Sequence, residues 1–170
     1  MNDFGADMEV IYLFFYGVLG MIRDYRTGDA FFVVPQTAQI HEAQIFAEGF
    51  DHIAAYSLVD ENNQILAVCG FDVFEWHGEL VAQCYALIGN NIGRKLFQLT
   101  HFLEREIPQQ AYRLGIKRIF MTVRDDFLQA KRLAHLLDFN PSRVLTNFFG
   151  GKTYQLYERN FYYGSSGSLN

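Results

Sequence analysis

Few residues in this chain are of a type and at a spacing that could form a catalytic or metal-binding site. The 170 residues contain no Ser/His/Asp or Cys/His arrangement typical of nucleophilic catalysis, no phosphate-binding P-loop and no metal-ligand spacing. Glu75, His77 and Glu79 gather around one polar turn, where charged side chains are usually solvated. Cys69 and Cys84 fall in separate apolar segments, and we interpret them as small buried residues of a reducing, cytoplasmic compartment. The sequence predicts no metal site.

The composition indicates a substantial core and argues against a nucleic-acid partner. Hydrophobic residues make up 50% of the chain and charged residues 19%, which excludes disorder of the whole chain. The net charge is −5, and the basic residues are outnumbered and dispersed. The 17 Phe and 10 Tyr residues fit either an aromatic-rich core or a surface that binds a protein partner.

The first apolar segment is Val10–Ile22. It follows three acidic residues instead of basic ones, so it does not resemble a secretory signal. It is also shorter than the roughly 20 apolar residues that a membrane span needs. We interpret it as a buried helix or a segment that docks on a partner. The polar run Arg23–Asp29 follows, so residues 1–29 are predicted to form an apolar N-terminal appendage.

The next segments alternate between strand-like and helical patterns. Ala30–Pro35 is an apolar, β-branched and aromatic run ended by proline, which predicts a strand. Gln36–Phe46 has helical spacing. Three β-prone runs with short polar connections follow at Ile53–Asp60, Gln64–Phe74 and Glu79–Ile88. Such connections predict an antiparallel meander.

A long amphipathic helix is predicted after Asn90. Its apolar face repeats at steps of three and four residues and consists of Ile92, Leu96, Leu99, Leu103 and Ile107. We expect Pro108 to kink or end this helix, Gln109–Leu114 to resume it and Gly115 to stop it.

The remaining elements complete a mixed fold. They are a strand at Lys117–Val123, a helix over Ala130–Leu137, and strands at Arg143–Asn147 and Thr153–Arg159 joined across Gly150 and Gly151. The strand–helix–strand step requires a parallel crossover. The fold class is therefore α/β (α+β), a mixed, mainly antiparallel six- to seven-stranded sheet flanked by helices. The predicted domain covers residues 30–160, and residues 161–170 form a tail that is flexible by composition.

This order of elements, together with Ala86–Pro141, resembles the GNAT (Gcn5-related N-acetyltransferase) superfamily. Members show a strand, a glycine-rich loop that opens a long helix, an entry such as GIKRI to the next strand, and a helix ending in leucine–glycine–phenylalanine. Here Gly115–Val123 reads GIKRIFMTV, and the second helix ends in Leu137, Asp138 and Phe139. The resemblance implies a GNAT-like domain and, for an active member, acetyl-CoA as the cofactor.

The resemblance also implies where the pyrophosphate of acetyl-CoA would bind. A pyrophosphate needs a helix N-terminus with free backbone N–H groups. Gly93 matches the family's first small residue, and Asn90 replaces its first Gln or Arg. Lys95 stands where the second small residue belongs, where it could crowd the phosphate or supply charge. The implied cofactor segment is Ile88, Gly89, Asn90, Asn91, Ile92, Gly93, Arg94 and Lys95.

The catalytic positions that the resemblance implies are largely replaced. The tyrosine that protonates the leaving thiolate corresponds to Ala134, the terminal glycine to Asp138, and an asparagine at the start of the helix to Phe127. Alanine cannot transfer a proton, and losing a positioned acid costs about 10²- to 10⁴-fold in rate. The base, often a glutamate on the meander, would be Glu79, with Tyr85 as a further candidate that also fits a packing role.

Two functions follow from these observations. In the first, the chain is a GNAT-like structural or protein-binding module without a cofactor, resembling degenerate GNAT-like proteins of bacteriophage virions. Its location would then be the cytoplasm or, if the chain is phage-encoded, the virion. The alternative is an active acetyl-CoA-dependent N-acetyltransferase that acts on a primary amine. The residues expected to contact a partner protein or a second copy are Tyr12, Phe14, Phe15, Phe148, Phe161, Tyr162 and Tyr163.

Overall fold

The computed structural model describes residues 20–40, 43 and 54–163. Within these residues seven strands form one sheet in the order β1-β2-β3-β4-β5-β7-β6. The strands are β1 (Gly20–Asp24), β2 (Ala54–Asp60), β3 (Ile65–Trp76), β4 (Glu79–Ile88), β5 (Arg118–Arg124), β6 (Asn140–Phe149) and β7 (Lys152–Asn160). The helices are α2 (Leu96–Leu114) and α3 (Leu128–Leu136), with short 3-10 turns η1 (Asp29–Phe32), η2 (Thr37–Gln39) and η3 (Gly93–Lys95).

The sheet is mixed, as the sequence predicts. Strands β4 and β5 are parallel, and every other neighbouring pair is antiparallel. The parallel pair flanks α2, so the crossover expected around the long helix is confirmed. The meander of three strands and the final hairpin are confirmed as well.

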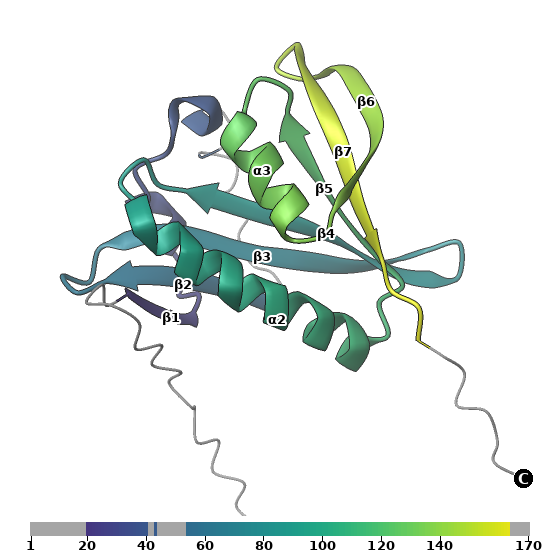
Figure 1. Ribbon diagram of the computed structural model, residues 1–170, viewed down its shortest axis with the longest axis horizontal. Helices are drawn as coiled ribbons and strands as arrows, with labels where there is room; N and C mark the ends of the chain where they lie inside the picture. Colours follow the sequence, from purple (N-terminus) through teal and green to yellow (C-terminus); the bar gives the residue numbers. More distant parts are fainter. Residues whose placement is uncertain (1–19, 41–42, 44–53, 164–170) are drawn as a thin grey trace, which may run out of the picture.

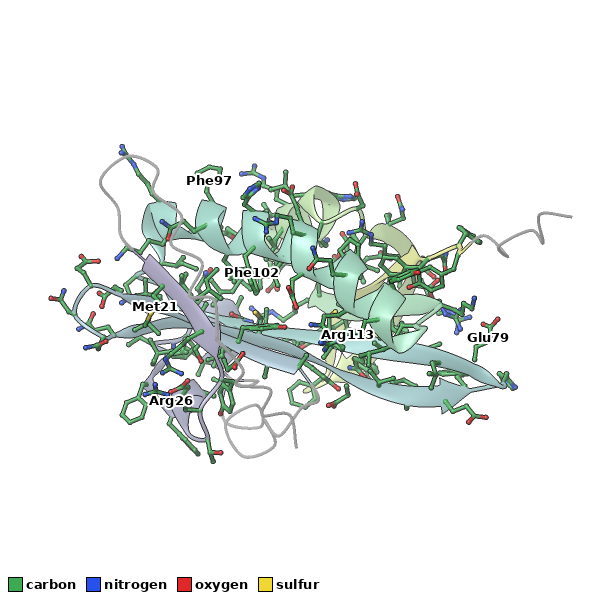
Figure 2. All side chains as sticks on the ribbon, turned by 90° about the horizontal axis from the view of Figure 1, so that it is seen from below. Met21, Arg26, Glu79, Phe97, Phe102 and Arg113 are labelled. Carbon is green, nitrogen blue, oxygen red and sulfur yellow. The ribbon has the colours of Figure 1, made fainter. Side chains whose placement is uncertain are left out.

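The two helices and the 3-10 turn η1 cover opposite faces of the sheet. Figure 2 shows α2 on one side of the sheet and Arg26, next to η1, on the other. A large core cluster lies beneath the helices and includes Leu99, Ile119 and Phe139, each at most 1% exposed. A smaller cluster on the other face contains Ala30 and Val33. Both faces of the central strands are therefore buried, which explains their near-continuous apolar sequences.

The prediction of a strand at Ala30–Pro35 is wrong. The segment begins as the 3-10 turn η1, and of its residues only Pro35 pairs with the sheet, in an isolated bridge to Gly89. Ala30 and Val33 are buried whereas Phe31 and Phe32 between them are exposed. This spacing of three residues suits a helical turn and conflicts with the alternation of a half-buried strand.

The expectation that the helix could end at Pro108 is wrong, whereas its continuation over Gln109–Leu114 is confirmed. α2 runs from Leu96 to Leu114 with Pro108 inside it. Proline lacks the N–H that would bond to the carbonyl of Glu104, and Glu104 is exposed, so water can satisfy that carbonyl. The burial of Ile107 and Ala111 on either side holds the helix together through this position. The predicted stop at Gly115 is confirmed, with φ of 70°.

The N-terminal part joins the sheet further upstream than expected. β1 lies inside the segment 1–29 that the sequence assigns to an appendage, and it pairs with β2 from Gly20↔Asp60 to Asp24↔Tyr56. Most of Val10–Ile22 lies outside the described residues, and so do residues 41, 42 and 44–46 of the helix expected at Gln36–Phe46. The domain boundaries stay predictions. Among the described helices, none combines the length and the apolar character that crossing a membrane requires.

Candidate functional site

The sheet opens between β4 and β5. These strands pair only over three positions, from Val81↔Arg118 to Gln83↔Phe120, and then diverge, as Figure 1 shows. A cavity of about 320 Å³ lies at this divergence. Its walls come from β3, β4, β5, α2, α3 and the β6–β7 hairpin. The parallel crossover thus creates a site between the two halves of the sheet.

The walls of the cavity are mainly apolar. Leu103 and Ile107 project from α2, and Phe127 and Leu133 from the segment leading into and along α3. Figure 2 shows Phe102 directed from α2 toward the sheet and Phe97 directed away from it. An apolar wall of this kind binds ligands by excluding water, and its few polar groups orient them.

One group of polar side chains connects β2 to α2 at the cavity. The Tyr56 hydroxyl donates a hydrogen bond to Glu106 Oε1 at 2.6 Å, and Gln110 Nε2 donates to the Tyr56 hydroxyl at 3.3 Å. Arg113 donates to the Gln110 side-chain oxygen. Burial and the neighbouring Glu106 carboxylate raise the pKa of Tyr56 well above its usual value. Tyr56 therefore stays protonated at neutral pH and acts as a donor to Glu106.

A second polar contact closes the edge of β4. Gln39 Nε2 donates to the carbonyl of Ala86 at 2.7 Å, and the N–H of Ile88 donates to Gln39 Oε1 at 3.0 Å. These backbone groups lie beyond the last paired residue, Gln83, where β5 has left the edge. Gln39 is 5% exposed, so its amide satisfies two backbone groups that burial would otherwise leave unpaired.

The two candidate catalytic residues lie in different places. Tyr85 lines the cavity, and burial, followed by the charge of Asp72, raises the pKa of Tyr85 to about 12. Glu79 pairs with Trp76 at the tip of the β3–β4 hairpin, is exposed, and is absent from the cavity lining (Figure 2). The structure therefore brings only Tyr85 to the site.

The cysteines border the cavity as unreactive thiols. Cys69 and Cys84 both line the cavity and are free. Burial raises the pKa of Cys69 to about 12 and that of Cys84 further. The thiolate is the nucleophile of cysteine chemistry, and its fraction is negligible at neutral pH for both residues.

The predicted cofactor segment is placed beside the cavity and contributes one residue to it. Of residues 88–95, only Ile88 lines the cavity. The N–H of Asn90 donates to Val34 at 2.9 Å, that of Ile92 to Gly89 at 3.3 Å, and that of Lys95 to Ile92 at 3.1 Å. These three amides are already bonded within the chain. Gly93 has φ of 50°, with open space where a side chain would begin.

The side chain of Lys95 extends toward β1. It forms an ion pair with Glu61, in the turn between β2 and β3, and this bond lowers the pKa of Glu61. Its Cδ lies 3.5 Å from the position that a Cβ on Gly20 would take. Lys95 therefore neither crowds the cavity nor directs its charge toward it.

α3 carries no proton-donating side chain at the position where the resemblance implies one. Ala134 is fully buried, and Phe127 is 6% exposed and lines the cavity. His135 is exposed and contacts Tyr157 edge-to-face. Asp138 has φ of 60°, so it adopts the left-handed conformation that glycine favours at this helix end. A residue in the left-handed conformation therefore ends this helix, and Ala134 and Phe127 stand at the positions where the resemblance implies a tyrosine and an asparagine.

The aromatic residues expected to bind a partner have different environments. Phe148 is 57% exposed and lines the cavity, where it contacts Tyr154 edge-to-face. Tyr163 donates to the carbonyl of Ile116 at 2.8 Å, and the N–H of Phe161 donates to Lys117, so both are tied to the domain itself. Tyr162 is 91% exposed. Tyr12, Phe14 and Phe15 lie outside the described residues.

Three residues of the site were not identified from the sequence. Gln39, Tyr56 and Glu106 come from segments far apart in the chain, and pairings across about 50 residues leave no local pattern. One signal existed for Glu106, because it lies one turn from Leu103 and Gln110 on the face of α2 that includes the buried Ile107. A carboxylate beside an apolar helix face marks a partnered or functional group.

The fold of the chain matches that of known acetyltransferases. In comparisons of three-dimensional structure, 271 solved chains match, and many are GNAT acetyltransferases. No family model matches the sequence, and no curated protein does. The chain therefore has the GNAT fold, with a mostly antiparallel seven-stranded sheet and two helices in the described residues.

Three of the matching structures show how far the likeness extends. A GNAT-family acetyltransferase of Bacillus anthracis matches with a TM-score of 0.61 and 11% identity, over 83% of this chain and 94% of its own. The ribosomal-protein-S5-alanine acetyltransferase of Vibrio fischeri gives 0.62 and 9%, over 88% and 96%. A chimera of the spermidine N-acetyltransferase of Vibrio cholerae gives 0.62 and 12%, over 83% and 95%. These identities show a shared fold alone.

Proposed function

We propose that this GNAT-fold protein is a structural or protein-binding module and that it does not transfer acetyl groups. The observation that carries the proposal is the residue at the position of the family's proton donor. Ala134 has no titratable group, and it is fully buried in the core. An enzyme of this class would lose the acid that protonates the leaving thiolate.

The cofactor segment supports the same conclusion. Pyrophosphate binding at a helix N-terminus depends on unpaired backbone N–H groups. The amides of Asn90, Ile92 and Lys95 are engaged by carbonyls of the chain, and Lys95 is paired with Glu61. Three amides of the segment are therefore already occupied, which speaks against pyrophosphate binding there.

The exposed aromatic side chains favour a protein partner. Phe31 is 64% exposed, Phe32 72% and Tyr162 91%. Aromatic residues are enriched in protein interfaces, because each aromatic side chain buries a large area while only a few of its torsion angles become fixed. The resemblance to degenerate GNAT-like phage proteins is the reason why we propose a virion assembly as one setting for this module.

An acyl-transfer assay tests the proposal. Thiol release from acetyl-CoA would be followed with a panel of primary amines, including polyamines and peptide α-amines. We expect a rate equal to the rate without protein at every pH tested between 6 and 9. A protein-dependent rate that saturates with amine would overturn the proposal.

A deletion tests the partner contact separately. Residues 1–19 precede β1, so removing them spares the strand that pairs with β2. We expect the shortened protein to fold and to lose self-association or binding to its partner, as measured by light scattering and co-purification with proteins encoded beside it. Unchanged association would contradict the role of Tyr12, Phe14 and Phe15.

The second candidate function is an N-acetyltransferase. The observation that favours it is the cavity between β4 and β5, bordered by Tyr85. Positioning a thioester next to an amine supplies a large share of the acceleration without a proton donor. The thiol-release assay decides between the two candidates.

A further inference from the structure

Three sulfur-bearing side chains line the cavity on one face of the sheet. Cys69 lies on β3, Cys84 on β4 and Met121 on β5, and all three contribute to the cavity wall. Cys69 belongs to the larger core cluster beneath the helices, and Cys84 and Met121 pack against that cluster. The three side chains therefore share one face of three neighbouring strands. The proposed function uses none of them.

The register of β3 and β4 brings the two thiols close together. Cys84 pairs with Phe71, which lies two residues beyond Cys69 on β3, so the two cysteines are diagonal neighbours on one face. The twist of a sheet shortens one of the two diagonals between paired strands. On the opposite face, the diagonal of the same sense joins Tyr85 and Asp72, whose side chains form a hydrogen bond. The thiols therefore lie on the short diagonal of the β3–β4 pair.

Met121 continues this row across the opening between β4 and β5. The last paired residues of the two strands are Gln83 and Phe120, and Cys84 and Met121 follow them directly. Residues at the same level of two parallel strands point to the same face of the sheet. Cys84 and Met121 therefore project from the two edges of the opening on the same face, and Cys69 lies next in the row.

Two thiols and one thioether form a donor set for a soft cation. Thiolate and thioether ligands select Cu⁺, whereas a structural zinc site needs four ligands from Cys, His or carboxylate side chains. The described residues that line the cavity include no histidine. In the described part of the chain, no three His, Cys, Asp or Glu side chains form a group that could hold a metal. The donors therefore suit Cu⁺ and not zinc.

We propose that Cys69, Cys84 and Met121 form a binding site for a soft monovalent metal ion, Cu⁺, in the cavity between β4 and β5. Two thiolates hold the ion, and the thioether of Met121 completes a set of three sulfur ligands. The site is independent of the aromatic residues assigned to a protein partner and involves no acetyl transfer.

Burial keeps both thiols protonated until the metal binds. The raised pKa of each thiol leaves little thiolate to react with oxidants. Binding of Cu⁺ breaks the two S–H bonds, the protons leave to solvent, and no electron is transferred. The bound group carries one net negative charge, and Arg124 is the basic residue among the described residues around the cavity. Its guanidinium offsets part of the cost of burying that charge.

An anaerobic titration of the full chain with Cu⁺, in competition with a chromogenic Cu⁺ chelator, tests the proposal. We expect a single Cu⁺ to bind per chain, with sulfur ligands alone in its X-ray absorption spectrum. Zn²⁺ at the same concentration is the comparison and should not displace it. Failure to compete with the chelator, nitrogen ligands in the spectrum, or displacement by Zn²⁺ would overturn the proposal.

Variants of the donors sharpen the test. Cys84→Ala removes a ligand, and we expect binding weakened by about 100-fold or more, since loss of a group that only supports a ligand already costs ~10–100-fold. Met121→Leu, a swap of similar volume, should weaken binding about tenfold and remove one sulfur from the absorption spectrum. Met21→Leu, on β1, is the matched control and should leave the affinity unchanged. Equal affinity in the wild type and Cys84→Ala would contradict the site.

Two further outcomes are decisive. If Cys84→Ala does not fold, Met121→Leu decides through its affinity and its absorption spectrum. A disulfide between Cys69 and Cys84 in protein purified without oxygen, detected by mass spectrometry, would assign the thiols to each other and overturn the metal site. The thiol-release assay on metal-free protein reports on acetyl transfer independently, so failure of the inference and failure of the proposed function can be told apart.

Discussion

At the scale of single residues, the end of α3 separates features that depend on the backbone from features that depend on side chains. Asp138 adopts the left-handed conformation that glycine favours at a helix end, and its N–H and that of Phe139 donate to His135 and Ala134. The backbone turn is therefore intact. Ala134 and Phe127 leave the turn without the groups for proton transfer.

The strain at Asp138 predicts a stabilising substitution. A non-glycine residue in the left-handed region costs roughly 1 kcal/mol, and Asp138 is exposed, with one contact to Arg159 at 3.5 Å. We expect Asp138→Gly to raise the free energy of unfolding by about 0.5–1 kcal/mol, measured by urea denaturation. Asp138→Ala is the control and should give no gain, because alanine carries the same strain. A loss of stability in Asp138→Gly would show that the Arg159 contact dominates.

At the scale of elements, the sequence predicted those helices and strands whose apolar residues repeat with a regular local period. The meander, α2, α3 and the final hairpin follow from apolar spacing and from turn residues such as Gly115. The failures at Ala30–Pro35 and Pro108 have a common cause, because tertiary contacts override local preference in both. Burial of Val33 against the sheet selects a turn over a strand, and burial of Ile107 carries α2 through the proline.

The site was less predictable than the elements for the same reason. The resemblance led to residues 88–95, but the cavity contains only Ile88 from that segment. The contacts that shape the cavity join Gln39 to β4 and Tyr56 to Glu106, across 47 and 50 residues. The periodicity of apolar residues along a sequence does not predict such long-range contacts, because they depend on where β5 diverges from β4.

Pro108 gives the element-scale prediction. It removes one hydrogen bond from α2 and costs up to ~3 kcal/mol relative to alanine in a helix interior. Pro108→Ala should raise the free energy of unfolding by about 1–3 kcal/mol, as judged by thermal and urea denaturation. Gln109→Ala, at the exposed neighbouring position, serves as the reference and should change stability by less than about 0.5 kcal/mol. No gain at Pro108 would mean that proline packing compensates for the missing bond.

At the scale of the whole molecule, residues 24–40 wrap around the sheet and link its first edge to the cavity. The chain leaves β1 and passes through η1 on the face opposite α2, as Figure 1 and Figure 2 show. Asp29 anchors this passage. It accepts hydrogen bonds from Arg23 at 2.7 and 3.0 Å, from Ser57 at 2.5 Å and from the N–H of Arg26 at 2.9 Å. The anchor holds the segment that delivers Gln39 to β4.

The anchor predicts a pH dependence of stability. Burial alone would raise the pKa of Asp29, but the bonds from Arg23, Ser57 and Arg26 outweigh it and hold the pKa below 3.8. A depressed pKa in the folded state means that this stabilisation is complete above pH 3.8 and is lost as the pH falls through the folded value. Asp29→Asn should cost about 2 kcal/mol at pH 7 and progressively less below pH 3.8.

The control for Asp29→Asn is Asp126→Asn, whose partner Arg124 lies at 2.5 Å but whose carboxylate is exposed. It should have little effect at either pH, because exposed pairs contribute little. A constant difference between wild type and Asp29→Asn from pH 7 to pH 2 would refute an electrostatic role for the anchor.

The most direct measurement is the calorimetric titration of the purified protein with acetyl-CoA. Gly93→Trp serves as the blocked variant. Gly93→Asn serves as the folding control, since asparagine tolerates the φ of 50° at this position. We predict no saturable heat at cofactor concentrations on the order of 1 mM, because three amides of the segment are already bonded within the chain. Binding in the micromolar range that Gly93→Trp abolishes and Gly93→Asn keeps would contradict the account and favour an acetyltransferase.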